Sequence, residues 1–292
     1  MGGIDGLDLG KFGIFTLDFE EQPAAQLRDS VQELEQQGWR AFWIPEIGGR
    51  EALTHAGFLL SCTERMHLIN GIARIWSRGA QATYGASLLL ADAYPDRHVL
   101  GLGFGGQPQP GIKPLAAMNA YLDELDALQT PNPRPRARMH RILAAYGPRM
   151  LELARERSAG AHPYHVNVAH TAQAREILGP DAFLGVEHAV LFESDPEVAR
   201  ARAREHLKDY LGTPYNIAKF RRLGYADEEI AHGGSDRLVD DLVFWGDVDS
   251  VVEKLHDHLR AGADHVAVQV IGTEPGRTAM PHWRRLGEAL LL

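Results

Sequence analysis

Short apolar runs alternate with amphipathic segments along nearly the whole of this 292-residue chain, and this alternation constrains the fold more than any other feature. The segments between the runs have helical spacing, for example Val251, Leu255 and Leu259 on one face before Gly262. About eight strands separated by helices in a chain of this length fit a closed (β/α)8 barrel better than an open sheet. The runs predicted as strands are residues 12–15, 41–44, 66–72, 99–103, 141–145, 162–168, 183–192 and 265–271.

One stretch breaks the alternation. Residues 195–245 are long, charged and mostly helical in pattern, and we interpret them as a helical insertion before the last strand. The insertion is expected to cover one side of the barrel mouth. Because no internal repeat, low-complexity tract or domain boundary is visible, residues 1–292 are predicted to form a single TIM barrel domain.

Composition excludes several classes of protein. The 39 acidic residues outnumber the 30 lysines and arginines, so a general basic surface for nucleic acid is absent. The single cysteine, Cys62, excludes an intramolecular disulfide and a cysteine-based zinc cluster. No apolar run approaches the length of a membrane helix, and the first residues lack the pattern of a secretory signal. We therefore expect a cytoplasmic protein that acts on a small molecule, without a membrane or nucleic-acid partner.

Gly101, Gly103 and Gly106 formally match the dinucleotide-binding pattern G-x-G-x-x-G. That pattern requires its last glycine to open a helix that meets the pyrophosphate, but residues 107–111 read Gln-Pro-Gln-Pro-Gly and predict a loop. A Rossmann site is therefore disfavoured. The glycines still allow the backbone to approach a flat ligand closely after the fourth strand.

Gly147 and Pro148 precede a helix that follows directly on an apolar strand. The free amides of its first turn, together with Arg149, are typical of an anion site, although a simple turn with a surface arginine explains the pattern as well. His162, His165 and His170 lack a carboxylate partner at metal-ligand spacing. We expect these histidines to line a pocket or to be exposed, and no metal site is predicted.

Two further segments end strands at the expected active face. Glu46 follows the second strand, where a carboxylate can bind substrate or transfer a proton, or can simply be a loop acid beside Arg50. Gly71 lies at the end of the third strand and permits a bulge, with an ordinary strand end before the packing residue Trp76 as the alternative. A G-x-S-x-G motif and a Walker A motif are both absent from the sequence, which argues against α/β-hydrolases and P-loop enzymes.

The ordered set of these segments resembles the luciferase-like flavin and deazaflavin oxidoreductases, and within them an actinobacterial-type group that uses coenzyme F420. The resemblance runs through most of the chain and is fairly specific for the superfamily. The segments that carry it are Trp-Ile-Pro-Glu at 43–46, Asn-Gly-Ile-Ala at 70–73, Tyr-Pro-Asp-Arg at 94–97, Leu-Gly-Leu-Gly at 100–103, Ala-Ala-Tyr-Gly-Pro-Arg-Met-Leu at 144–151 and Ala-Gly-Ala-Asp-His-Val at 261–266.

The resemblance implies roles for individual residues. Gly71-Ile72 takes the place of a non-proline cis bond that bulges against the cofactor ring, and Glu46 that of an acidic residue near the reactive side of the ring, as proton donor or substrate anchor. Arg74 is expected to shape the same pocket. The remaining cofactor contacts implied are Gly103, Gly105 and Gly106 at the ring and ribityl chain, and Gly147, Pro148, Arg149 and Met150 at the phosphate. On the substrate side the resemblance leads us to Trp76, His165, His170 and Trp245.

The implied chemistry is hydride transfer between coenzyme F420 and a small organic substrate. An FMN-dependent monooxygenase on the same fold is the first alternative, and a non-catalytic cofactor-binding barrel is the second. Homodimers are common on this fold, although no stripe of residues in the sequence specifies one. The segment between the fourth and fifth strands is short and proline-rich, whereas relatives often carry a longer insertion there. The sequence therefore does not identify the segment that would cover the substrate.

Overall fold

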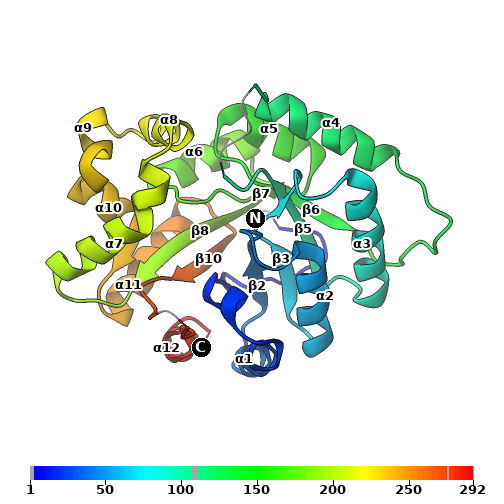
Figure 1. The fold of residues 1–292 in the computed structure, drawn as a ribbon, viewed down its shortest axis with the longest axis horizontal. Coiled ribbons are helices and arrows are strands. Elements are labelled where there is room, and N and C mark those ends of the chain that lie inside the picture. The colour runs from blue at the N-terminus through cyan, green and yellow to red at the C-terminus, as the bar shows by residue number, and fades with distance from the viewer. Residues whose placement is uncertain (1–2, 107–110, 275, 292) are drawn as a thin grey trace.

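The computed structural model describes residues 3–106, 111–274 and 276–291. Its strands form one parallel sheet that closes on itself, because β10 pairs with both β1 and β8. Figure 1 shows the barrel with its helices packed around it. The barrel strands are β1 (Phe12–Phe15), β2 (Ala41–Ile44), β3 (His67–Asn70), β5 (His98–Gly103), β6 (His140–Leu143), β7 (Gly160–Ala161), β8 (Phe183–Leu191) and β10 (His265–Val270). The predicted (β/α)8 fold is confirmed.

The helices alternate with these strands as the apolar spacing predicts. Pro148 occupies the first turn of α5, where its missing amide costs nothing, and Asp247 caps α11 by accepting a hydrogen bond from the Ser250 amide. The helices around the barrel are α1 (Ala24–Gln36), α2 (Ala52–Cys62), α3 (Ala80–Ala93), α4 (Pro114–Ala127), α5 (Pro148–Arg157), α6 (Val168–Leu178), α11 (Val248–Arg260) and α12 (Met280–Leu290), with the 3₁₀ turn η1 (Asp18–Glu21) after β1.

The predicted insertion is also confirmed, and it lies between β8 and α11. Figure 1 shows its helices gathered on one side of the barrel, in yellow-green to orange. The insertion consists of α7 (Pro196–Leu211), α8 (Pro214–Arg222), α9 (Asp227–Ile230), η2 (Ala231–Gly233) and α10 (Asp236–Leu242), and it ends in the short strand β9 (Val243–Trp245). β9 pairs with the end of β8, so the insertion is joined to the barrel wall by main-chain hydrogen bonds.

The sixth strand was predicted wrongly. The sequence predicts a strand over 162–168, but β7 is only Gly160–Ala161, residues 162–167 form a loop and Val168 begins α6. Pro163 has no amide to donate to a ladder, and Asn167 caps α6 by accepting from the His170 amide. His165 takes a left-handed backbone conformation, with φ +49°, that a regular strand does not contain.

Two layers of side chains form the core. One fills the barrel interior, with Phe15, Trp43, Ile69 and Phe183 among its buried members, and the other fills the space between the strands and the helices. Within the described ranges, no helix has the length and apolar character needed to cross a bilayer. The small strand β4 (Ala73–Arg74) pairs with β5 just beyond β3, at the carboxyl-terminal end of the barrel. That end is where catalytic groups lie in (β/α)8 enzymes.

Candidate active site

The chain makes a bulge directly after β3. The Gly71–Ile72 peptide bond is cis, in the place where the family resemblance implies one. The Gly71 amide donates to the Ile44 carbonyl over 2.8 Å, and the Glu46 amide donates to the Ile72 carbonyl over 3.2 Å. These two bonds fix the bulge against the end of β2.

The floor of the mouth beside this bulge has no room for side chains on two glycines of β5. A Cβ on Gly101 would lie 1.8 Å from the Asn70 carbonyl oxygen, and one on Gly103 would lie 2.7 Å from Ile72 Cγ1. Such distances require a glycine at each position. The glycines therefore let the bulge at Asn70 and Ile72 pack directly against β5.

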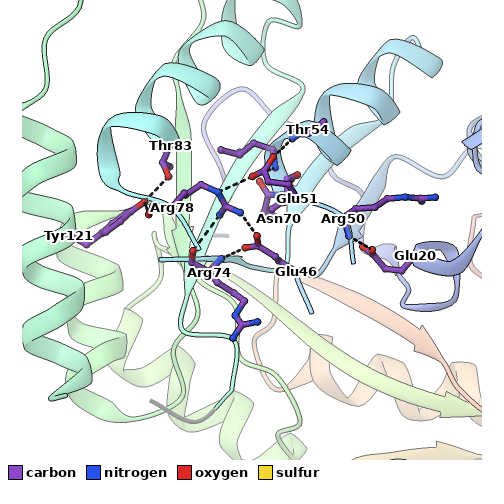
Figure 2. A network of polar contacts seen from close by, with 12 residues as sticks. Glu20, Glu46, Arg50, Glu51, Thr54, Asn70, Arg74, Arg78, Thr83 and Tyr121 are labelled. Carbon is purple, nitrogen blue, oxygen red and sulfur yellow. Dashed lines mark hydrogen bonds and ion pairs between the residues drawn. The ribbon is translucent and has the colours of Figure 1, made fainter. Parts of the chain in front are cut away.

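Glu46 lies at the centre of a polar network between β2 and α3 (Figure 2). Its side chain is 8% exposed, as is that of Arg78, with which it forms an ion pair. Its second oxygen accepts from the Arg74 amide over 2.6 Å. Arg78 also pairs with Glu51 over 2.8 Å, and Glu51 caps α2 by accepting from the amides of its first turn. Both oxygens of Glu46 are therefore used to join strand ends and helix starts.

Arg74 and Trp76 lie on the same side of the mouth as the loop after β5. The Arg74 side chain runs along Gly105, where a Cβ would lie 2.6 Å from Arg74 Cγ, and the Trp76 ring is 5.2 Å from that of Phe104. Arg74 Nε and Trp76 Nε1 are buried, with no hydrogen-bond partner in the part of the chain that is described. These are donors that a bound ligand can satisfy. Gly106 follows with φ +116°, and residues 107–110 lie outside the described ranges.

The anion site that the sequence predicts falls on the first turn of α5. Gly147 is its N-cap residue and has no side chain to cap the helix, Pro148 is at N1, and Arg149 is exposed. The insertion adds a second cation, because Arg222 Nη1 lies 3.3 Å from the point where a Cβ on Gly147 would be. Its guanidinium carbon is 6.0 Å from the centre of the Tyr146 ring. The helix dipole and the guanidinium of Arg222 thus meet at one place, and Arg149 is exposed in the same turn. Met150 follows in the same turn, half-buried.

The histidines after β7 are buried, and they lie in different surroundings. His162 stacks on Trp43 with ring centres 4.4 Å apart and shares a hydrogen bond with the Gly185 carbonyl, and burial lowers its pKa to about 4. His165 lies against Glu187 of β8, with its amide 2.9 Å from the carboxylate. His170 is in α6, not in a loop, and its Nε2 is 2.7 Å from the Tyr146 carbonyl.

In the described ranges, no observed contact joins Trp245 to Trp76, His165 or His170. It lies in β9, donates from Nε1 to Asp240 over 2.8 Å and faces the cations of Arg200 and Lys254. These contacts join the insertion to α11, and the substrate contact that the resemblance implies for Trp245 stays a prediction.

Sequence reasoning missed three residues that the fold places at or near the mouth. Arg78 begins the α3 segment and looked like a helix-start residue. Glu187 is the one acidic residue inside the apolar run of β8, and this position alone indicates a buried acid. It is fully buried, which raises its pKa to about 8. Lys219 lies in a charged stretch of the insertion and looked solvent-exposed, but burial lowers its pKa to about 7.

Two clefts lie at the other end of the barrel. One of about 960 Å³ opens near the starts of β5 and β6, with His98, His140 and Arg141 in its lining. A second, of about 690 Å³, lies beside Trp39 and His67. Because the groups described above sit at the carboxyl-terminal ends of the strands, we assign the candidate site to the mouth and not to these clefts.

Comparison with known proteins points to one family. The sequence profile of the luciferase-like monooxygenases matches residues 10–114, which include β1 to β5 and the bulge after β3. The resemblance to the luciferase-like family is confirmed. A protein of Mycobacterium tuberculosis (strain ATCC 25618 / H37Rv), Rv3520c, named as a candidate coenzyme F420-dependent oxidoreductase, is 24% identical, with 93% of this chain and 96% of that protein covered.

Solved structures share the barrel fold at low identity. The coenzyme F420-dependent tetrahydromethanopterin reductase of Methanopyrus kandleri has a TM-score of 0.71 at 16% identity, covering 96% of this chain and 98% of that one. An F420-dependent secondary alcohol dehydrogenase in complex with an F420–acetone adduct has a TM-score of 0.71 at 12% identity, covering 96% and 97%. The FMN complex of the oxygenating constituent of 3,6-diketocamphane monooxygenase from Pseudomonas putida has a TM-score of 0.65 at 16% identity, covering 96% of each chain. At these identities the likeness establishes the fold.

Proposed function

We propose that this protein is an oxidoreductase that uses coenzyme F420 for hydride transfer to or from a small organic substrate. The observation that carries the proposal is the mouth of the barrel, where the chain bulges after β3 against the glycines of β5 and the uncapped start of α5 lies beside Arg222. A flat, anionic ligand fits both features, since its ring can lie on the bulge, and the helix start, Arg149 and Arg222 can bind its phosphate. The F420-dependent names of the relatives agree with this chemistry.

The residues present fit such a cofactor. Gly71, Ile72 and Gly103 would support the ring, and Gly105 and Gly106 would follow the ribityl chain. Gly147, Pro148, Arg149 and Met150 would hold the phosphate. The buried and unpartnered Arg74 Nε, in the part of the chain described, supplies a further donor toward the ring. A bound deazaflavin supplies a ring carbon that donates or accepts hydride, while the protein positions the substrate and manages protons.

Glu46 has a narrower role in this proposal than the sequence implies. Its two oxygens already accept from Arg78 and from the Arg74 amide. We propose that it holds the bulge and the start of α3 in place under the ring, so that a change at Glu46 acts through position. Its action as a proton donor stays a prediction.

An FMN-dependent monooxygenase is the second candidate. The specific observation in its favour is that the FMN complex of the camphane monooxygenase superposes over 96% of this chain, nearly as well as the F420 enzymes do. The two functions share a phosphate site and a ring site, and they differ in the ring that is bound and in the use of oxygen.

Parallel titration of the purified protein with F420 and with FMN, followed by fluorescence, tests both candidates. We expect F420 to bind more tightly, and Arg149→Ala to weaken F420 binding about tenfold or more, because a charge-assisted contact to phosphate is lost. Arg155→Ala is the matched control, since Arg155 lies in the last turn of the same helix and donates to the Ile177 carbonyl. It should leave the affinity unchanged.

The other possible outcomes of these titrations contradict the F420 proposal. Preference for FMN, with oxygen uptake when a flavin reductase and reduced nicotinamide are added, would establish the monooxygenase. Cofactor binding without turnover of any activated alkene, imine or alcohol would favour a non-catalytic barrel. Binding of neither cofactor would refute both proposals. On the family resemblance alone we also propose a homodimer, which light scattering of the purified protein tests.

A further inference from the structure

Glu187, His165 and Lys219 form a buried cluster between the barrel wall and the insertion. Glu187 lies in β8, His165 in the loop after β7 and Lys219 in α8, so three segments far apart in the sequence contribute one side chain each. Their residues are 0%, 1% and 5% exposed. Burial of the ionisable side chains of Glu187, Lys219 and His165 is costly unless their charges are paired or the groups are neutral. The cluster therefore calls for an explanation beyond packing.

The short β7 strand creates the cluster. Since the chain leaves the barrel wall after Ala161, the loop runs beside β8, and the Glu187 amide donates to the Pro163 carbonyl over 3.0 Å. The left-handed turn at His165 then points its amide at Glu187 Oε2, 2.9 Å away. Lys219 Nζ donates to the Tyr164 carbonyl over 2.5 Å, which fixes α8 on the same loop.

Polar atoms in this cluster have no partner within the described ranges. They are Glu187 Oε1 and both ring nitrogens of His165, whose side chain is 0% exposed. A carboxyl and a neutral imidazole with free positions can pass a proton and take one back. The titratable and charged groups that face the cluster are Tyr146 before α5, Tyr164 in the same loop, His170 of α6, His188 of β8, His206 and Tyr210 of α7, and Arg222 of α8 itself.

The cluster adjoins the proposed phosphate site through Tyr146. Lys219 Nζ lies 5.6 Å from the centre of the Tyr146 ring, and Tyr146 directly precedes Gly147, the N-cap of α5. An anion bound at that helix start would therefore lie near the lysine. A nearby negative charge favours the charged ammonium over the neutral amine, so anion binding and protonation of Lys219 are linked.

We propose that Lys219, Glu187 and His165 form a proton store that takes up a proton when an anionic cofactor binds at α5. The inference rests on the proposed function.

Calorimetry of F420 binding in buffers of different ionisation enthalpy counts the protons taken up and needs no substrate. Because the pKa of Lys219 is about 7 before binding, we expect uptake of roughly half to one proton per cofactor near pH 8. The same deazaflavin without its phosphate tail should bind with little uptake. Lys219→Met should abolish most of the uptake, and Lys208→Met, which removes an exposed lysine of α7, should not change it.

Two further variants keep the result interpretable. Lys219→Arg retains a cation that does not titrate in this range and should bind F420 without proton uptake, even if the methionine variant folds poorly. Glu187→Gln should move the midpoint of uptake to lower pH, since the Glu187 charge raises the pKa of Lys219. F420 binding without proton uptake by the wild type, or with uptake unchanged in Lys219→Arg, would overturn the proton store and leave the proposed function standing. Failure of F420 to bind at all would overturn both.

Discussion

Replacement of Arg78 by methionine tests whether the polar network beneath the mouth stabilises the fold. The substitution removes the guanidinium and leaves the Glu46 carboxylate buried, with the Arg74 amide at 2.6 Å as its remaining partner. Removal of one member of a buried ion pair costs about 3–5 kcal/mol. We expect the lower end, about 3 kcal/mol, because Glu46 keeps one strong hydrogen bond and Glu51, with its side chain 45% exposed, can be rehydrated.

The assay is urea unfolding followed by tryptophan fluorescence and far-ultraviolet circular dichroism. With a slope of about 3 kcal/mol/M for a chain of this size, the midpoint should fall by roughly 1 M. Adding Glu46→Gln to Arg78→Met removes the stranded charge and should restore about 2 kcal/mol, which a double-mutant cycle measures as coupling. Arg28→Met is the control, since the side chains of the Arg28–Asp29 pair are 51% and 71% exposed and its loss should cost less than about 0.5 kcal/mol. Equal midpoints for the Arg78 and Arg28 variants would refute this account of the network.

Three other predictions concern packing, charge and hydrogen bonding. Gly103→Ala should destabilise the fold by about 1–3 kcal/mol through overpacking, whereas Gly85→Ala, with open space at a helical position, should stabilise it by about 0.5–1 kcal/mol, both measured by urea unfolding. The raised pKa of Glu187, about 8 in the folded state against 4.5 for the free side chain, means that stability should fall as pH rises through this window. Glu187→Gln should lack that slope in thermal melts taken across the window, and an unchanged slope would exclude Glu187 as its cause. Thr171→Val removes the 2.8 Å partner of His258 Nδ1 and should lower the unfolding free energy by about 1–3 kcal/mol, so an unchanged denaturation curve would contradict this estimate.

The barrel could be predicted from the sequence because buried parallel strands appear as continuous apolar runs. The β8 and β10 runs show this clearly, since nearly every residue in them is buried. The sixth strand failed because periodicity does not register the local competition from Pro163 and Asn167, which end the ladder and start a helix. A strand of two residues has no pattern that a sequence argument can detect.

The site was predictable where the backbone itself defines it. Gly71, Gly103 and Gly147 are signalled by their positions at strand ends and helix starts. The burial of charged side chains by distant segments was not predictable. Lys219 lies among charged residues of the insertion, and nothing in the local sequence marks it as buried. Trp245 stays a predicted substrate residue, and its observed contacts are with Asp240 and Arg200 of the insertion and with Lys254 of α11.

The early departure of the chain after β7 has a consequence for engineering. Here the insertion holds the loop that replaces the rest of the strand, since Lys219 of α8 donates to the Tyr164 carbonyl. The insertion is thus not an interchangeable module. A chimera that grafts the segment between β8 and α11 from another barrel would also have to graft the loop at 162–167, or this loop would lose its partner in α8.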